Sequence, residues 1–99
     1  MPLRIVLSER AFADLRDIWL YTARRWGVDQ AERYEGEMEE AFQKLSDVPG
    51  LGSRLEHGGH LYRRWRSGRH LIVYRADGEI LRVVRVVHDQ SDLEGSDIA

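Results

Sequence analysis

The residues best able to do chemistry lie in the last half of the chain, where arginine, histidine and tyrosine are closely spaced. Residues 54–85 carry eight arginines against three acids, and Lys44 is the only lysine. Arginine is favoured where a planar group makes bidentate contact with a carboxylate or a phosphate. A codon bias toward arginine would give the same composition. If the arginines serve to bind a partner, the residues expected to contact it are Arg63, Arg64, Trp65, Arg69, His70, Tyr74, Arg82, Arg85 and His88. On a purely structural interpretation, His70 and Tyr74 are core or core-edge residues with satisfied hydrogen bonds.

Two other patterns are weaker. The glycine-rich stretch 49–60 resembles a phosphate-binding loop in composition, but it has no Gly-Lys-Ser/Thr motif and no helix start after it. His57 and His60 have no third ligand nearby, which is typical of solvated loop histidines. The chain has no cysteine, which excludes disulfides and thiolate metal sites. The sequence therefore predicts neither a metal nor a cofactor.

Length and composition are those of one small globular domain. The chain has 99 residues, of which 42% are hydrophobic and 32% charged. We expect a single domain over residues 1–92 and a flexible acidic tail over 93–99. The first four residues contain no apolar segment typical of a signal peptide, and no run approaches the roughly 20 apolar residues of a membrane helix. The predicted location is the cytoplasm, with no membrane contact.

Residues 69–88 predict a β-hairpin. Two runs rich in aliphatic residues flank Asp77-Gly78, a dipeptide typical of two-residue hairpin turns. That turn places His70 opposite Arg85, Ile72 opposite Val83 and Tyr74 opposite Leu81. His88 then lies on the other face from His70, so the two histidines are not expected to act as an acid–base pair.

Two helices are predicted before the hairpin. Ser8 is a candidate N-cap for a helix that begins at Glu9 and ends at Gly27. Asp29 and Glu32 have the spacing of a capping box for a second helix, which Pro49-Gly50 ends. The very short link predicts an antiparallel helical hairpin. Its apolar stripes include three large residues that we expect in the core, namely Trp19, Trp26 and Tyr34.

The expected fold is α+β, with the order β-α-α-β-β-β. Residues 3–7 and 61–66 supply two further strands, so the helical hairpin packs on one face of a small, mainly antiparallel, four-strand sheet. Both faces of the 69–88 hairpin are largely apolar, and two helices cover only one of them. We therefore expect a partner to cover the second face, which is rimmed by arginines.

Several segments together resemble the ParE toxins of bacterial type II toxin–antitoxin systems, within the wider RelE/ParE superfamily. The matching segments are I-W-L-Y-T-A-R-R-W-G at 18–27, A-E-R-Y at 31–34, P-G-L-G at 49–52, G-R-H-L-I-V-Y-R at 68–75 and R-V-V-H-D-Q-S-D at 85–92. They cover most of the chain in order, and the β-α-α-β-β-β order agrees with the family fold.

The resemblance implies a small toxin that is made beside a cognate ParD-like antitoxin. ParE toxins generally act on DNA gyrase, with the A-type subunit of gyrase as the expected contact, and they block replication by trapping the enzyme on cleaved DNA. They are not known as enzymes, and no sequence-specific DNA binding is expected of this chain alone. The flexible C-terminal segment of the antitoxin would supply the missing cover, and the arginine-rich surface would suit an acidic, amphipathic segment.

Two alternatives remain open. The sister RelE branch cleaves messenger RNA on the ribosome with clustered basic residues and acid–base side chains, for which His70 and Arg85 are candidates here. The acids that follow His88 would repel an RNA backbone, and the lysines such nucleases often use are absent. These departures favour the ParE branch. The third hypothesis is a non-toxic module that only binds an antitoxin.

Overall fold

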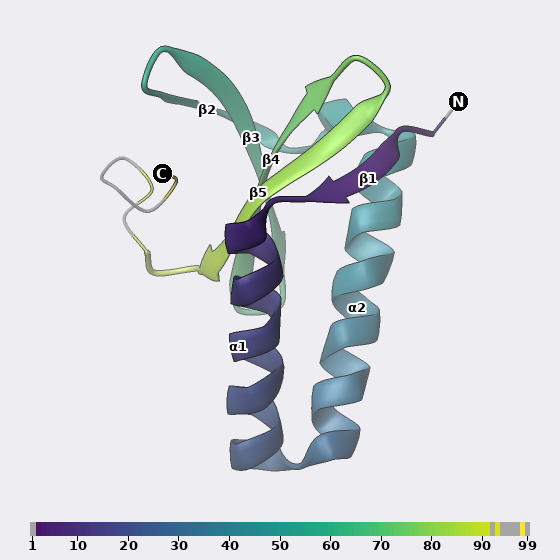
Figure 1. Cartoon of the computed structure of the whole chain (residues 1–99), viewed down its shortest axis with the longest axis vertical. Coiled ribbons are helices and arrows are strands. Elements are labelled where there is room, and N and C mark those ends of the chain that lie inside the picture. Colours follow the sequence, from purple (N-terminus) through teal and green to yellow (C-terminus); the bar gives the residue numbers. More distant parts are fainter. Residues whose placement is uncertain (1, 92, 94–97, 99) are drawn as a thin grey trace.

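The protein consists of a helical hairpin packed on one face of a five-stranded sheet (Figure 1). The structure is a computed structural model that describes residues 2–91, 93 and 98. The predicted α+β class and the antiparallel helical hairpin are confirmed. No helix in this described part of the chain is long and apolar enough to span a membrane.

The two helices are α1, Glu9–Trp26, and α2, Val28–Asp47. The Ser8 hydroxyl accepts a hydrogen bond of 3.0 Å from the Ala11 backbone N–H, which confirms the predicted N-cap. Gly27, at φ 98°, is both the end of α1 and the N-cap of α2. The predicted capping box is wrong because α2 begins one residue before Asp29, which instead lies in the first turn near the positive end of the helix dipole.

The sheet has the strand order β1-β5-β4-β3-β2. Its strands are β1 (Arg4–Leu7), β2 (Ser53–His57), β3 (His60–Ser67), β4 (His70–Asp77) and β5 (Ile80–His88), and β1 runs parallel to β5 while the other pairs are antiparallel. The sequence predicted four strands. The fifth, β2, lies in the stretch expected to be a loop, where a 3₁₀ turn at Pro49–Leu51 precedes it.

The β4–β5 register differs from the predicted one for two reasons. Asp77 pairs with Ile80, so the turn is Gly78-Glu79, and β5 carries an extra residue where Val73 pairs with Arg85 but Tyr74 pairs with Val83. Such a bulge shifts every later side chain of its strand to the other face. The corrected pairs are Ile72 with Val86 and His70 with His88, so the expectation that the two histidines lie on opposite faces is wrong.

The Asp14 side chain of α1 binds the bulge. Its carboxylate accepts hydrogen bonds from Arg85 Nε at 2.7 Å and Nη2 at 3.1 Å, and from the Val86 backbone N–H at 2.9 Å. Both charged side chains are largely buried, with 12% of Arg85 and 16% of Asp14 exposed. One carboxylate therefore fixes α1 against β5 at the residue where the strand changes face.

Two apolar clusters hold the fold. The helix-facing cluster joins both helices to Ile72, Tyr74, Leu81, Val83 and Val86. The second cluster lies on the outer face of the sheet, defined by Leu55, Val73 and Val87, with Tyr62, Leu71 and Val84 at its margin. Leu93 and Ile98 are buried in this second cluster. The expectation that only a partner covers the outer face is therefore wrong, because the chain covers part of it.

The predicted division into a 1–92 domain and a 93–99 tail falls mostly outside the described residues, and it stays a prediction. Among the large residues expected in the core, Trp26 is 61% exposed at the end of α1, so that expectation is wrong. Tyr34 is half-buried and packs against the helix-facing cluster.

We predict that Asp14→Ala destabilises the fold by about 3 kcal/mol, because it removes the carboxylate from a largely buried ion pair and from a backbone donor. The free energy of unfolding in urea measures the effect. Asp17→Ala is the matched control on the same helix. Its ion pair with Arg16 is 3.6 Å long and exposed, so it should change stability by less than about 0.5 kcal/mol. Equal losses in the two variants would contradict the role given to Asp14.

Candidate interaction surfaces

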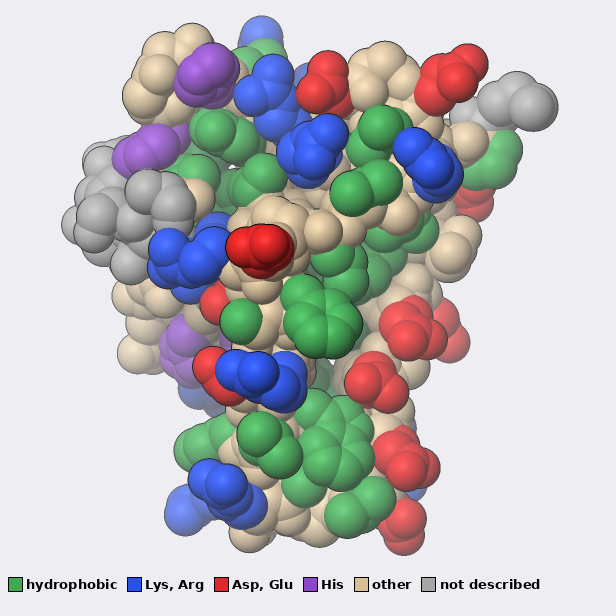
Figure 2. All heavy atoms as spheres, viewed as in Figure 1, with side chains coloured by type: hydrophobic (Ala, Val, Ile, Leu, Met, Phe, Trp, Pro, Cys, Tyr) green, Lys and Arg blue, Asp and Glu red, His purple; other side chains and the backbone are tan. Residues whose placement is uncertain are grey.

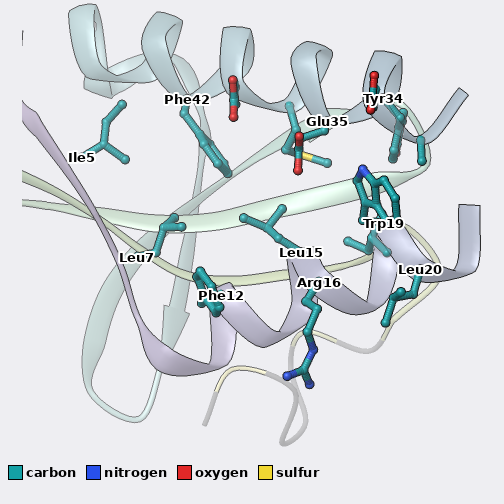
Figure 3. A pocket seen from close by; sticks show the side chains of 15 residues that line it. Ile5, Leu7, Phe12, Leu15, Arg16, Trp19, Leu20, Tyr34, Glu35 and Phe42 are labelled. Atoms are coloured by element: carbon teal, nitrogen blue, oxygen red, sulfur yellow. The ribbon is translucent and has the colours of Figure 1, made fainter. Parts of the chain in front are cut away.

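A groove of about 780 Å³ lies between α1 and α2 and continues to the edge strand β1. In Figure 3, Leu15 and Trp19 of α1 and Phe42 of α2 point into the space between the helices. Phe12 stands at its margin with 64% of its surface exposed. The helical hairpin thus presents part of its apolar stripe to solvent instead of burying all of it against the sheet.

The α2 wall of this groove is acidic. The lining residues from α2 include Glu32, Glu35 and Glu39, whereas Arg16 of α1 points away from α2 and pairs with Asp17 (Figure 3). Figure 2 shows acidic side chains along one side of α2, while Lys and Arg side chains alternate with apolar ones over the strands. The groove therefore suits an amphipathic segment with apolar anchors and with basic groups on the side that meets α2.

A second site is a polar cluster that joins α2 to the β3–β4 turn. The Tyr34 hydroxyl oxygen accepts a hydrogen bond from the Arg69 backbone N–H at 3.0 Å and lies 2.6 Å from His70 Nδ1. It lies 3.1 Å from the Ser67 carbonyl. The rings of His70 and His88 are 5.7 Å apart, a neighbourhood that the bulge in β5 creates.

The protonation states of this cluster follow from burial. Burial lowers the pKa of His70 below its usual 6.5, and the positive charges of His88 and Arg69 act in the same direction against Asp89 and Asp14. Burial also raises the pKa of the Tyr34 hydroxyl, which therefore keeps its proton. The hydroxyl has one proton, so it either donates to the Ser67 carbonyl and accepts from a protonated His70 Nδ1, or donates to a His70 Nδ1 that carries no proton.

Asp89 lies close to several basic side chains at the edge of this cluster. Its Oδ2 lies 2.6 Å from Arg66 Nη2 and 4.0 Å from Arg69 Nε. His88 Nδ1 lies 3.1 Å from Asp89 Oδ1 and 3.2 Å from the Gln90 backbone nitrogen. That ring nitrogen can serve only one of the two: it accepts from Gln90 when Nδ1 carries no hydrogen and donates to Asp89 when it carries one.

The residues predicted to contact a partner fall into three groups, and their role stays a prediction. Arg69, His70 and His88 meet in the polar cluster. Arg64 and Arg82 lie on strands of the outer face, away from the helices. The other four hold the fold: Arg85 binds Asp14, Trp65 packs on the helix-facing cluster, Arg63 donates to the Gly52 carbonyl at 2.8 Å, and Tyr74 is fully buried.

Tyr74 shows why a conspicuous residue need not be functional. Its hydroxyl donates to the Pro49 carbonyl at 2.7 Å and accepts from the Gly52 backbone N–H at 2.9 Å. It thereby fixes the segment between α2 and β2.

Three residues that contact the predicted ones were not predicted to do so. Asp14, Tyr34 and Asp89 contact Arg85, His70 and Arg69, and each contact joins elements that are distant along the chain. Local spacing and residue type therefore could not identify them. In the described part of the chain, no group of three or more histidine, aspartate or glutamate residues could hold a metal ion.

The fold matches that of chains in two solved toxin–antitoxin structures. The chain superposes on a structure of a chromosomal ParDE system from P. aeruginosa with a TM-score of 0.74, at 19% identity over 87% of this chain and 95% of the other. A chain of the RelBE2 complex from Mycobacterium tuberculosis gives a TM-score of 0.66, at 22% identity over 89% and 99%.

Sequence comparison identifies the family. The family model of the ParE toxin of type II toxin–antitoxin systems matches residues 5–93. Toxin ParE1 of Caulobacter vibrioides is 43% identical, over 83% of this chain and 84% of the relative, and Toxin ParE1 of Mycobacterium tuberculosis is 39% identical, over 95% and 97%. The chain belongs to the ParE toxin family, as the sequence motifs indicated.

We predict that the free energy of unfolding falls as pH drops below 6.5, because the unfolded chain takes up a proton at His70 before the folded chain does. The loss should continue until the lowered pKa of the folded state is passed. His70→Asn keeps an acceptor for Tyr34 but does not titrate, so it should flatten the stability profile in this range. Urea unfolding across this pH range measures both proteins, and profiles of equal slope would contradict the prediction.

Proposed function

We propose that this ParE-family toxin acts in the cytoplasm on DNA gyrase, blocks replication by holding the enzyme on cleaved DNA, and is neutralised by a ParD-like antitoxin. On this proposal, the chain inhibits another enzyme and is not an enzyme itself. Family membership supports the toxin role, and the relatives it matches are named as ParE toxins.

The groove between α1 and α2 is the observation that carries the antitoxin part of the proposal. It is apolar along its floor, acidic along its α2 wall and open along the helical hairpin. These are the features that bind an amphipathic helix through apolar anchors spaced along one face. The similar ParDE structure is titled as a toxin–antitoxin system, which supports a ParD-like segment as the occupant.

The alternative of a RelE-like ribonuclease gains one observation from the structure. The bulge brings His70 and His88 together beside Tyr34, Arg66 and Arg69, which are residue types used for acid–base catalysis and phosphate binding. Against it, Tyr34 occupies His70 Nδ1, and Asp89 offsets the two arginines. The gyrase hypothesis therefore remains the better supported.

Inducible expression without an antitoxin, followed by pulse labelling of DNA and protein synthesis, separates these functions. We expect DNA synthesis to stop first and purified gyrase to accumulate cleaved DNA in the presence of the chain. Early arrest of protein synthesis with cut messenger RNA, lost in His70→Ala, would favour the ribonuclease and contradict the proposal. Continued synthesis of both would indicate a non-toxic antitoxin-binding module.

For antitoxin binding, we predict that Phe12→Ser lowers the affinity by about 1.5–3 kcal/mol, the effect typical of an exposed aromatic anchor. Phe12 is mostly exposed, so the fold should keep its stability. Tyr21→Ser is the matched control, because Tyr21 is 61% exposed on the same helix but does not line the groove. Calorimetric titration with the cognate antitoxin measures both. An unchanged affinity in Phe12→Ser would place the antitoxin elsewhere.

A further inference from the structure

Two arginines lie directly opposite each other on β4 and β5. Arg75 pairs with Arg82, and like charges in directly opposed positions destabilise a sheet. Among the described residues, no carboxylate lies within ion-pair distance of either guanidinium. The fold thus holds two positive charges side by side on a rigid part of the sheet, without a described acid to offset them.

Arg75 also has an unused donor. Its guanidinium lies 5.7 Å from the centre of the Tyr62 ring, and its buried Nε has no hydrogen-bond partner among the described residues. A buried donor of a charged group that makes no hydrogen bond is destabilising. An anion placed between Arg75 and Arg82 would relieve the repulsion between the two side chains.

Further arginines continue this pair across the outer face. Arg64 lies opposite Val73, and Arg66 lies opposite Leu71, so both project from β3 on the side of the second cluster. Neighbouring strands are about 4.8 Å apart, and alternate residues of one strand are about 7 Å apart. Arg82, Arg75 and Arg64 therefore form a diagonal row across three strands, which we call the arginine track, whereas Arg66 beside it is paired with Asp89.

We propose that the arginine track binds the phosphodiester backbone of nucleic acid and, resting on the proposed function, contacts the DNA on which gyrase acts. Planar guanidinium groups on fixed strands match phosphate oxygens. Contacts of this kind read the backbone and not the sequence.

An acidic protein segment is the competing occupant, and the charge distribution favours nucleic acid. The groove between the helices has carboxylates on one wall and suits a segment with basic groups, whereas the arginine track has the opposite charge. The two surfaces lie on different layers of the protein, so the partner of one need not displace the partner of the other (Figure 1).

Fluorescence anisotropy of labelled DNA, single-stranded and duplex, with the purified full chain over a salt series tests the track. Binding should weaken with salt, and each lost phosphate contact on duplex DNA should reduce the slope of log K against log salt by about 0.9. The variant Arg75→Gln/Arg82→Gln should lose about tenfold in affinity and about 2 in slope. It should unfold at no lower a temperature than the parent, because the substitutions remove a repulsion.

Arg24→Gln/Arg25→Gln is the matched control, since it removes the same charge from the last turn of α1. It should leave the affinity and the slope unchanged. Three results would overturn the track: absence of DNA binding at low salt, equal losses in the two variants, or polyglutamate binding as tightly as DNA with the same loss on Arg75→Gln/Arg82→Gln.

These outcomes can be told apart from a failure of the proposed function. A chain that binds DNA through the track but leaves DNA synthesis running would keep the site and contradict the gyrase proposal. A chain that stops DNA synthesis but does not bind DNA would contradict the track alone.

Discussion

The carboxylate of Asp14 fixes the geometry on which the functional surfaces depend. It binds both the side chain of Arg85 and the backbone N–H of Val86, at the bulge of β5. Strand β1 pairs with β5 only as far as Val83, so a backbone donor beyond that point on the same edge needs another acceptor. Because α1 supplies that acceptor, the helix layer and the register of the central hairpin are determined together.

The bulge in β5 determines which side chains lie on each face of the sheet. Beyond the bulge, Val86 and His88 lie on the helix-facing side with Ile72 and His70, while Val87 lies in the outer cluster. Without the extra residue the two histidines would be on opposite faces. The contact between the His70 and His88 rings therefore depends on one inserted residue, more than ten residues along the chain from His70.

The sequence predicted the class of fold, the start and end of α1 and the family, because those rest on local signals. Ser8 and Gly27 act through backbone groups within one helical turn, and their effect is readable from residue type alone. The bulge was not readable, because the valines of 83–87 give an apolar residue at almost every position and so fit either register. The strand β2 was hidden by its glycine-rich surroundings, where only Leu55 is buried. Exposed apolar residues were the other limit of prediction. Phe12 and Trp26 fit the apolar stripe of α1, yet both are mostly exposed. A helical period shows which side chains share a face, but it cannot show whether that face meets the protein's own sheet or a partner.

The arrangement of polar groups suits the proposed binding role better than the alternative of catalysis. A general acid or base needs a ring nitrogen able to exchange a proton with substrate, but His70 Nδ1 holds the Tyr34 hydroxyl and thereby ties α2 to the β3–β4 turn. Arg66 and Arg69 share Asp89, so the polar cluster carries little excess charge for a scissile phosphate. By contrast, Arg75 and Arg82 have no such acid among the described residues. Uncompensated charge on rigid strands costs stability, and a binding partner that offsets it recovers that stability as affinity. The outer face therefore has the positive charge expected of the proposed binding surface. The polar cluster instead holds α2 against the β3–β4 turn.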